Sequence, residues 1–208
     1  MKAIVTGGCG FIGSNLVDSL VQKDVEVIVI DNQSADCHDQ VYQNNNASYH
    51  KYDINDYGLI EPLFTDVENP RLAMQTNVLG TCNVLEASRK HNIKRVMYSS
   101  TSSAYGLKND PPLVENMHRD CLNPYSVSKC AGEDLCKMYY SLYGLETVTF
   151  RYFNVYGERQ PTKGQYAPVI GIFQRQYSNG EPMTVVGDGL QTRDYVHVSD
   201  VVQANIHM

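Results

Sequence analysis

The chain has 208 residues, of which 42% are hydrophobic, and a formal net charge of −6. A chain of this length can bury a sizeable core in one or two domains. An acidic chain without a basic tract gives no electrostatic support for binding nucleic acid, so we predict no nucleic-acid partner. Its apolar runs are as short as β-strands and far below the length that crosses a bilayer, so we predict no membrane partner.

Six cysteines and six histidines are scattered along the sequence, and no two cysteines form a C-x-x-C pair. We therefore predict reduced thiols with packing roles and no metal site. The first apolar run begins at residue 2, which leaves no room for a signal or transit peptide. A cytoplasmic location is the resulting expectation.

Short apolar segments alternate with amphipathic ones along the chain. The segments predicted as strands are 2–6, 25–30, 47–52, 94–99 and 145–150. Those predicted as helices are 11–22, 55–64, 70–90 and 124–143, with a further helix that begins near Ser199. Such alternation is typical of a parallel sheet covered by helices on both faces.

The first predicted strand runs directly into a glycine-rich turn, GGCGFIG at residues 7–13. Gly7 permits a tight turn, Gly10 lets the backbone approach a pyrophosphate, and Gly13 lets the following helix pack close to the strand. The N–H groups at the start of that helix then face the phosphates. The pattern predicts a dinucleotide site in a Rossmann-like, doubly wound α/β fold.

The second predicted strand ends in Asp31. A carboxylate at this place accepts hydrogen bonds from a ribose 2′-hydroxyl and repels a 2′-phosphate. An incidental acid is the alternative, but strand, glycines, helix, strand and acid all stand in register. We therefore predict NAD, rather than NADP, as the cofactor.

Tyr125 and Lys129 stand four residues apart in a segment that favours a helix, so both side chains leave the same helix face. An ammonium beside a phenol favours the phenolate, so Lys129 is expected to lower the pKa of Tyr125 from its ordinary value of about 10. Such a tyrosine can take a proton from an alcohol while hydride leaves the same carbon. A tyrosine and a lysine at this spacing more often lie on a solvated helix face. The dinucleotide pattern at the start of the chain favours the catalytic interpretation here.

A series of motifs spans nearly the whole chain. They are TGGCGFIGS (6–14), DIND (53–56), TNVLGT (76–81), YSSTSSAYG (98–106), NPYSVSK (123–129), RYFNVYGERQ (151–160) and GDGLQTRDYVHVSD (187–200). In these motifs and their order the chain resembles the NAD-dependent epimerase/dehydratase family, which belongs to the extended short-chain dehydrogenases/reductases. Within that family it is most similar to the UDP-glucose and UDP-N-acetylglucosamine 4-epimerases.

The resemblance implies roles for individual residues. Tyr125 would take the proton of the sugar 4-hydroxyl, Lys129 would bind the nicotinamide ribose, and Thr101 would share the hydrogen bond of the 4-oxygen. The residues implied at the cofactor are Gly7, Gly10, Phe11, Ile12, Gly13, Asp31, Asn32, Asp53, Ile54, Asn77, Ser99, Tyr125, Lys129 and Tyr152. The residues implied at the substrate are Thr101, Tyr125, Asn154 and Arg193.

Some of these residues have a specific implied task. Asp53 and Ile54 would hold the adenine ring, and Asn77 would line the nicotinamide pocket. Asn154 would contact the substrate, and Arg193 would bind its diphosphate. A guanidinium suits the last task because its fixed fork reaches two phosphate oxygens together.

The implied catalytic hydroxyl lies in the run Ser-Ser-Thr-Ser-Ser at residues 99–103. Ser100 or Ser102 could replace Thr101 if the loop is shifted by one residue. The dehydratase branch of the family carries an Asp-Glu pair directly after this hydroxyl, where this chain has Ser102 and Ser103. Serine cannot do general acid–base work at neutral pH, which favours epimerisation over dehydration.

The sequence departs from the family pattern in two places. Between Asp53 and Asn77 the family carries an apolar fourth strand, whereas this chain runs from helix to helix. Either the strand at 94–99 moves beside the first strand, or the sheet stays split. The family also continues beyond Met208. We therefore expect an NAD-binding domain at 1–150 and a partial, truncated sugar-nucleotide domain at 151–208.

The predicted function is an isomerase: an NAD-dependent epimerase that oxidises C4 of a UDP-sugar transiently. UDP-glucose and UDP-galactose, or their N-acetyl forms, are the expected substrates. The two departures leave open a truncated, non-catalytic NAD-binding relative, and the motifs leave open a UDP-uronate epimerase or decarboxylase. Family members pair through helices that correspond to 70–90 and 124–143, so a homodimer through these helices is a further hypothesis.

Overall fold

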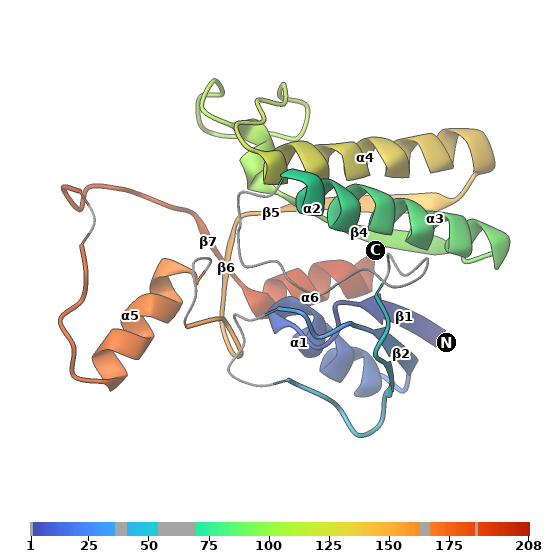
Figure 1. Cartoon of the computed structure of the whole chain (residues 1–208), viewed down its shortest axis with the longest axis horizontal. Coiled ribbons are helices and arrows are strands. Elements are labelled where there is room, and N and C mark those ends of the chain that lie inside the picture. Colours follow the sequence, from blue (N-terminus) through green and yellow to red (C-terminus); the bar gives the residue numbers. More distant parts are fainter. Residues whose placement is uncertain (1, 36–40, 54–69, 163–166, 186) are drawn as a thin grey trace. The chain divides into compact units, whose positions relative to one another are not determined.

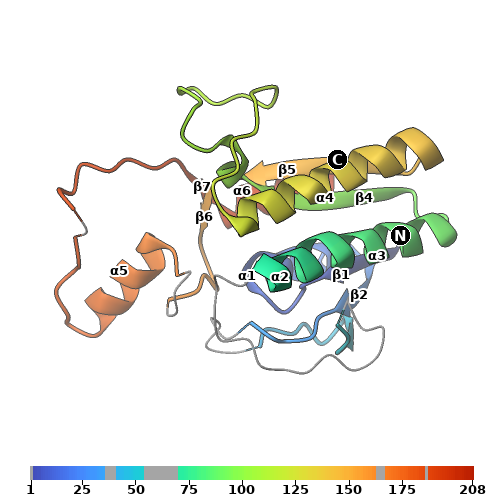
Figure 2. The ribbon, with the colours of Figure 1, turned by 45° about the horizontal axis from the view of Figure 1, so that its top comes forward.

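The computed structural model of the chain describes residues 2–35, 41–53, 70–162, 167–185 and 187–208. The chain forms two compact units. The first combines Met1–Asp53 with Phe153–Met208, and the second is Ile54–Tyr152. Strands and helices alternate in both, as predicted (Figure 1, Figure 2). The predicted division at residue 150 concerns function and stays a prediction.

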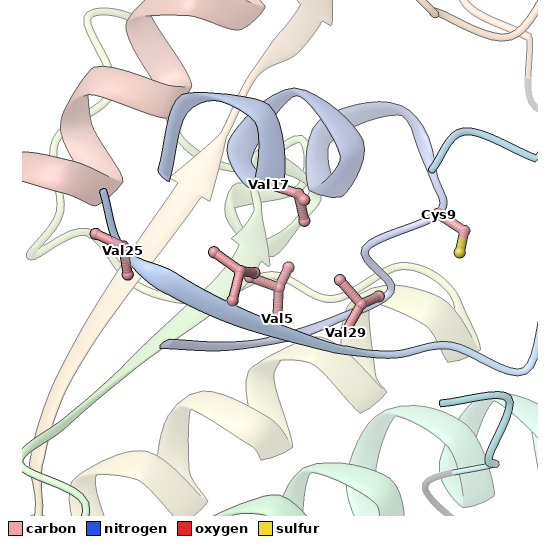
Figure 3. Packing of buried hydrophobic residues seen from close by; sticks show 6 residues of the cluster. Val5, Cys9, Val17, Val25 and Val29 are labelled. Atoms are coloured by element: carbon pink, nitrogen blue, oxygen red, sulfur yellow. The ribbon is translucent and has the colours of Figure 1, made fainter. Parts of the chain in front are cut away.

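The first unit begins with a parallel sheet in the order β1-β2-β3. Its strands are β1 (Lys2–Thr6), β2 (Glu26–Ile30) and β3 (Ser48–His50), and helix α1 (Phe11–Val21) connects β1 to β2. Every second residue of β2 points to the helix side, because side chains alternate along a strand. The resulting core consists of Val5, Cys9, Val17, Val25, Val27 and Val29 (Figure 3).

The rest of the first unit contains a two-stranded parallel ladder. It pairs β6 (Asn154–Tyr156) with β7 (Tyr195–His197), and helix α5 (Val169–Ser178) stands between them in the chain. Helix α6 (Val198–His207) follows β7 and packs against α1. Its Val201 and Val202 are buried. The helix expected near Ser199 is therefore confirmed.

The second unit is built on a parallel pair of strands, β4 (Arg95–Thr101) and β5 (Glu146–Tyr152). Helix α4 (Pro124–Tyr143) connects the two strands and packs against both. Thr101 lies opposite Tyr152 where the ladder ends. The core of this unit consists of Leu85, Tyr98, Cys136, Tyr139 and Leu145.

A long helical segment precedes β4 and also packs against α4. It consists of α2 (Pro70–Met74), a π-helical turn η1 (Gln75–Leu79) and α3 (Gly80–Lys90); a 3₁₀ turn η2 (Ser102–Tyr105) follows β4. The helix predicted at 70–90 is thus confirmed, apart from the π-helical turn. Among the described helices, none combines the length and apolarity that crossing a membrane requires.

The other predicted strands and helices in the described ranges are found with bounds that differ by a few residues. The helix predicted at 55–64 lies outside the described residues. Within the described residues β1 pairs with β2 in the first unit, and β4 pairs with β5 in the second. The two alternatives for the sheet concern β1 and β4, which lie in different units, so both stay predictions.

Candidate active site

The glycine turn of the first unit has the close backbone packing that its sequence predicts. Gly7 has a positive φ of 68°, and its N–H donates to the Ile30 carbonyl at 2.9 Å. A Cβ on Gly13 would lie only 2.2 Å from the Gly7 carbonyl oxygen. Helix α1 can therefore begin directly against the end of β1.

The first turn of α1 has free donors for an anion. Its N-cap is Gly10, and no side chain caps the helix. The N–H groups of the first helical residues have no acceptor within the helix. Phe11, Ile12 and Gly13 contribute these groups, and a phosphate at this place would complement both them and the helix dipole.

Asp31 is joined to the glycine turn by a hydrogen bond. Its Oδ2 accepts the Cys9 N–H at 2.8 Å, and its Oδ1 accepts the Gln33 N–H at 2.7 Å. A carboxylate has several acceptor positions, so Asp31 can also accept from a ribose hydroxyl. Asn32 lies beside this carboxylate and donates to Asp53 Oδ2 at 2.8 Å. A glycine cradle that a Cβ would fill, beside a carboxylate with open acceptor positions, fits the predicted NAD.

In the second unit, a capping box fixes the start of helix α4. Ser126 N–H donates to the Asn123 side chain at 2.8 Å, and Asn123 N–H donates to Ser126 Oγ at 3.3 Å. Pro124 occupies the first turn, where its missing N–H costs nothing. These contacts place Tyr125 in the first turn of α4 and Lys129 one turn later, as the spacing predicts.

Of the three candidate hydroxyls, Thr101 is the one in contact with Tyr125. Thr101 is buried at the end of β4, and its hydroxyl lies near enough to the Tyr125 phenol to act on the pKa of that group. The Ser100 hydroxyl instead donates to Glu133 on α4. Ser102 belongs to the turn η2. The geometry therefore favours Thr101 over its neighbours.

Lys129 does not lower the pKa of Tyr125, so this expectation from the sequence is wrong. Burial raises the pKa of Tyr125, and the Thr101 hydroxyl opposes that shift. The Lys129 Nζ instead lies over the ring of Tyr98, 4.7 Å from its centroid. Burial lowers the pKa of Lys129 to about 8, although the negative charge of Glu133 acts in the opposite direction.

Asn77 is bound to the turn of α4 that carries the catalytic pair. Its Nδ2 donates to Ser128 Oγ at 2.9 Å, and Ser128 Oγ donates to the Tyr125 carbonyl at 2.8 Å. Ser128 is fully buried. Asn77 also lies within the π-helical turn η1, and such turns occur frequently at functional sites. The structure therefore brings Asn77 beside Tyr125 and Lys129.

The remaining predicted residues lie at strand ends. Ser99 is an exposed residue of β4, and Tyr152 stacks on Phe150 with ring centroids 5.8 Å apart. Asn154 donates from Nδ2 to the Asp194 carbonyl at 3.0 Å. Asp194 directly follows Arg193, which is exposed. Asn154 and Arg193 are thus close together in the first unit, at the start of β6 and β7. Ile54 lies outside the described residues.

Three residues at this site were not predicted from the sequence: Tyr98, Ser128 and Glu133. Tyr98 supports the Lys129 ammonium, and Ser128 links Asn77 to α4. Glu133 binds Ser100 next to Thr101. The available signal was their spacing, since Ser128 and Glu133 stand one and four residues from Lys129 on the same helix.

A sequence model of the NAD dependent epimerase/dehydratase family matches residues 3–208. The chain belongs to this family. The family uses NAD, so the predicted cofactor is confirmed, and the glycine turn with Asp31 is the part of the described chain that fits it.

The chain is similar to several proteins that are named as sugar-nucleotide enzymes. A Methanocaldococcus jannaschii protein, provisionally named UDP-glucose 4-epimerase, is 41% identical over 221 residues, which are 98% of this chain and 72% of that protein. The UDP-N-acetyl-alpha-D-glucosaminuronate decarboxylase of Bacillus cytotoxicus is 34% identical over 229 residues, which are 99% of this chain and 70% of that enzyme. The crystal structure of Thermotoga maritima UDP-glucose 4-epimerase with UDP-glucose matches with a TM-score of 0.89 and 35% identity, over 99% of this chain and 72% of that one.

These similarities confirm the predicted epimerase/dehydratase family and its Rossmann-like α/β fold. The chain is an NAD-dependent family member related to sugar-nucleotide epimerases. The relatives differ in the reaction that they catalyse on the sugar, because one is a decarboxylase. The substrate of this chain therefore depends on the residues of its own site.

Proposed function

We propose that this epimerase-family protein interconverts UDP-sugars that differ in configuration at C4, either UDP-glucose and UDP-galactose or their N-acetyl forms. The observation that carries the proposal is the buried Thr101 hydroxyl close to the Tyr125 phenol, one helical turn before Lys129. Ser102 and Ser103, which follow Thr101, provide no acid for the elimination of water. The site therefore favours epimerisation over dehydration.

The glycine turn and Asp31 would hold NAD in this reaction. When bound, NAD⁺ supplies a hydride acceptor that carries a positive charge. Lys129 would donate from its ammonium to the nicotinamide ribose, for which three N–H donors are available. With a pKa of about 8, this ammonium is about nine-tenths protonated at pH 7.

Tyr125 would accept the proton of the sugar 4-hydroxyl, and Thr101 would hold the same oxygen in place. The raised pKa of Tyr125 disfavours the phenolate, but the nearby Thr101 hydroxyl opposes that shift. The positive charge of the cofactor acts in the same direction. Once the 4-keto sugar turns over, Tyr125 would return the proton as hydride returns to the opposite face.

Asn154 and Arg193 would bind the sugar nucleotide. Arg193 is exposed and presents a planar fork of N–H donors suited to a diphosphate. The homodimer through the helices at 70–90 and 124–143 and the cytoplasmic location stay predictions.

The test is an assay of the purified chain with NAD and each UDP-sugar, in which products are separated by chromatography. Tyr125→Phe should lose about a hundredfold or more of the rate, since it lacks the group that carries the proton. Tyr177→Phe is the matched control, because Tyr177 is 76% exposed on α5. A full rate in Tyr125→Phe would reject the assigned base.

A second candidate is a UDP-uronate decarboxylase or epimerase, favoured by the similarity to the Bacillus enzyme. The same assay with UDP-glucuronate and its N-acetyl form separates the two, because loss of CO₂ changes the product mass. A non-catalytic relative is the third outcome. Separate titrations of NAD and a UDP-sugar identify it, since an enzyme binds both at micromolar concentration and a remnant binds neither.

A further inference from the structure

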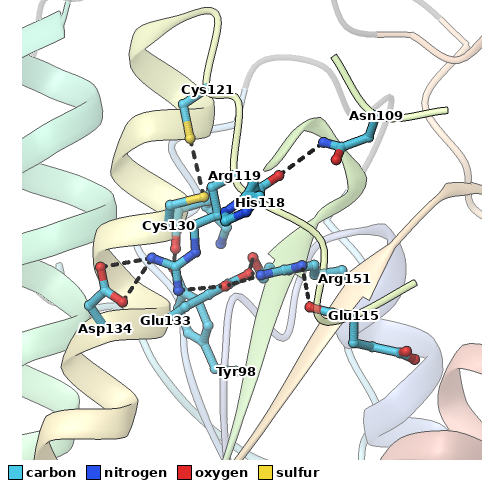
Figure 4. A network of polar contacts seen from close by, with 12 residues as sticks. Tyr98, Asn109, Glu115, His118, Arg119, Cys121, Cys130, Glu133, Asp134 and Arg151 are labelled. Carbon is cyan, nitrogen blue, oxygen red and sulfur yellow. Dashed lines mark hydrogen bonds and ion pairs between the residues drawn. The ribbon is translucent and has the colours of Figure 1, made fainter. Parts of the chain in front are cut away.

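Glu133 is a buried carboxylate in the second unit that none of the roles above uses. It lies on α4 one turn after Lys129 and is 7% exposed. Figure 4 shows it between the guanidinium groups of Arg119 and Arg151. A buried charge of this kind is expensive unless it is fully paired.

The pairing of Glu133 is complete. Arg151 donates from Nε to Oε1 at 2.9 Å and from Nη2 to Oε2 at 2.8 Å. Arg119 Nη2 donates to Oε2 at 3.0 Å, and the Ser100 hydroxyl donates to Oε1. Burial raises the pKa of Glu133, but these partners lower it more, so the net shift is downward and the carboxylate is ionised.

The partners of Glu133 come from three other segments of the second unit. Ser100 is on β4 directly before Thr101, and Arg151 is on β5 directly before Tyr152. Arg119 comes from the segment between η2 and α4. The carboxylate therefore fastens the ends of both strands to the helix that carries Tyr125.

The segment before α4 is fastened to the same cluster. Arg119 also binds both carboxylate oxygens of Asp134 at 2.8 Å. Arg151 donates to the Glu115 carbonyl at 3.2 Å and lies over the ring of Tyr105, 4.9 Å from its centroid. Asp134 is the natural comparison for Glu133, because it neighbours it on α4 but its side chain is 65% exposed.

Glu133 also acts on Lys129 through its charge. Both side chains lie on one face of α4, four residues apart. The ionisable groups that act on the ammonium are Glu133 and Cys136 from α4, and β4 contributes the ring of Tyr98. Burial favours the neutral amine, and Glu133 is a nearby negative charge that opposes this effect.

We propose that Glu133 is a positioning residue, which holds the Thr101 hydroxyl against Tyr125 through Ser100 and keeps the Lys129 ammonium protonated through its charge. The inference rests on the proposed function. One side chain would exert two distinct effects. The hydrogen bond to Ser100 acts on geometry, and the charge acts on protonation.

Two variants separate these effects. Glu133→Gln keeps the shape of the side chain and removes the charge. Ser100→Ala removes the hydrogen bond to Glu133 and keeps the charge of Glu133. It also keeps the proposal testable if Glu133→Gln does not fold. Asp134→Asn is the control, since it removes an adjacent charge from the same helix without touching Ser100 or Lys129.

The first measurement is the NMR titration of the Lys129 Nζ, assigned through its loss in Lys129→Met. We expect the titration to move to lower pH in Glu133→Gln and to stay in place in Ser100→Ala and Asp134→Asn. This readout does not depend on turnover. An unchanged Lys129 titration in a folded Glu133→Gln variant would overturn the proposal, whether or not the protein epimerises UDP-sugars.

The second measurement is the pH profile of the NAD-loaded protein with its UDP-sugar. A catalytic group misplaced by about 1 Å costs about a hundredfold, so we expect kcat to fall about tenfold to a hundredfold in Ser100→Ala with KM nearly unchanged. In Glu133→Gln, whose amide oxygen can still accept from Ser100, the alkaline loss of kcat should begin at lower pH. Unchanged kcat in Ser100→Ala would overturn the positioning role. A wild-type protein inactive on every UDP-sugar would reject the proposed function, and the Lys129 titration would then decide this inference.

Discussion

Replacing Lys129 by methionine should stabilise the protein while it removes the proposed function. The Lys129 Nζ is held over the Tyr98 ring, 4.7 Å from its centroid. Burial lowers the pKa of this lysine from an ordinary 10.5 to about 8. Folding therefore removes the ammonium from water, so the charged form of Lys129 is less stable in the folded protein than in the unfolded chain.

The size of the effect follows from the lowered pKa. A lowering from 10.5 to about 8 corresponds to about 3 kcal/mol, since one pKa unit is worth about 1.4 kcal/mol. Methionine loses the cation–π contact with Tyr98, which is worth about 1 kcal/mol, and regains part of it through its thioether. We expect Lys129→Met to raise the free energy of unfolding at pH 7 by about 2 kcal/mol.

The stability that Lys129→Met gains over wild type should decrease as pH rises. Below a pH of about 8, Lys129 is charged in both states, and the folded protein bears the whole cost. Between about 8 and 10.5 the unfolded chain still binds a proton that the folded chain has lost, so wild-type stability recovers as pH rises. The advantage of Lys129→Met should therefore shrink by more than half by about pH 10.

Urea denaturation of wild type and variant at pH 7 and pH 10 measures both quantities. Lys137→Met is the matched control, because Lys137 is an exposed residue about two turns later on α4. It should change stability by less than about 0.5 kcal/mol at either pH. A Lys129→Met protein less stable than wild type at pH 7, or an equal gain in stability at both pH values, would show that the buried ammonium does not destabilise the fold.

Three further substitutions test the glycine turn, the preference for NAD, and the contact between Gly132 and Tyr98. Gly13→Ala places a Cβ 2.2 Å from a backbone carbonyl, so it should cost about 1–3 kcal/mol of stability and weaken NAD binding; calorimetry that shows neither loss would contradict the glycine cradle. Asp31→Asn removes a charged acceptor, so NAD affinity should fall about tenfold and the preference over NADP should narrow. Titration with both cofactors checks this, and an unchanged preference would exclude Asp31 as the selector. Gly132→Ala places a Cβ 2.1 Å from the buried Tyr98 hydroxyl and should cost about 1–3 kcal/mol in urea denaturation; unaltered stability would show that Tyr98 can move aside.

Local sequence signals were sufficient for much of the fold. The apolar run 2–6 followed by glycines predicts the strand, turn and helix at the amino terminus, because these residues have few other uses in that order. The start of α4 follows from Asn123 and Pro124, and its end from Gly144, whose φ is 70°. In each case the decisive contacts are between residues close in sequence.

Contacts between distant residues could not be predicted. Spacing places Tyr125 and Lys129 on one helix face, but it does not say that the ammonium turns to the ring of Tyr98 on β4. Glu133 reads as an ordinary helix acid until the β4–β5 ladder brings Ser100 and Arg151 to it. The direction of the Tyr125 pKa depends on burial, which no local pattern contains.

The place of the strand at 94–99 could be predicted only in part. The loss of an apolar segment between Asp53 and Asn77 indicates a missing strand, but either alternative for the sheet fits the same sequence. Within the second unit, the register sets Thr101 opposite Tyr152 at the end of β4 and β5. Register depends on pairing across the whole ladder rather than on any one residue.

In the proposed reaction, hydride leaves C4 of a UDP-sugar and returns to the opposite face of the same carbon. This transfer is tested with UDP-galactose that carries deuterium at C4, converted by the NAD-loaded protein in ordinary water and analysed by NMR and mass spectrometry. We predict UDP-glucose that retains the deuterium at C4. A product with protium at C4 would mean exchange of a proton with water, and would exclude the return of the same hydride to C4.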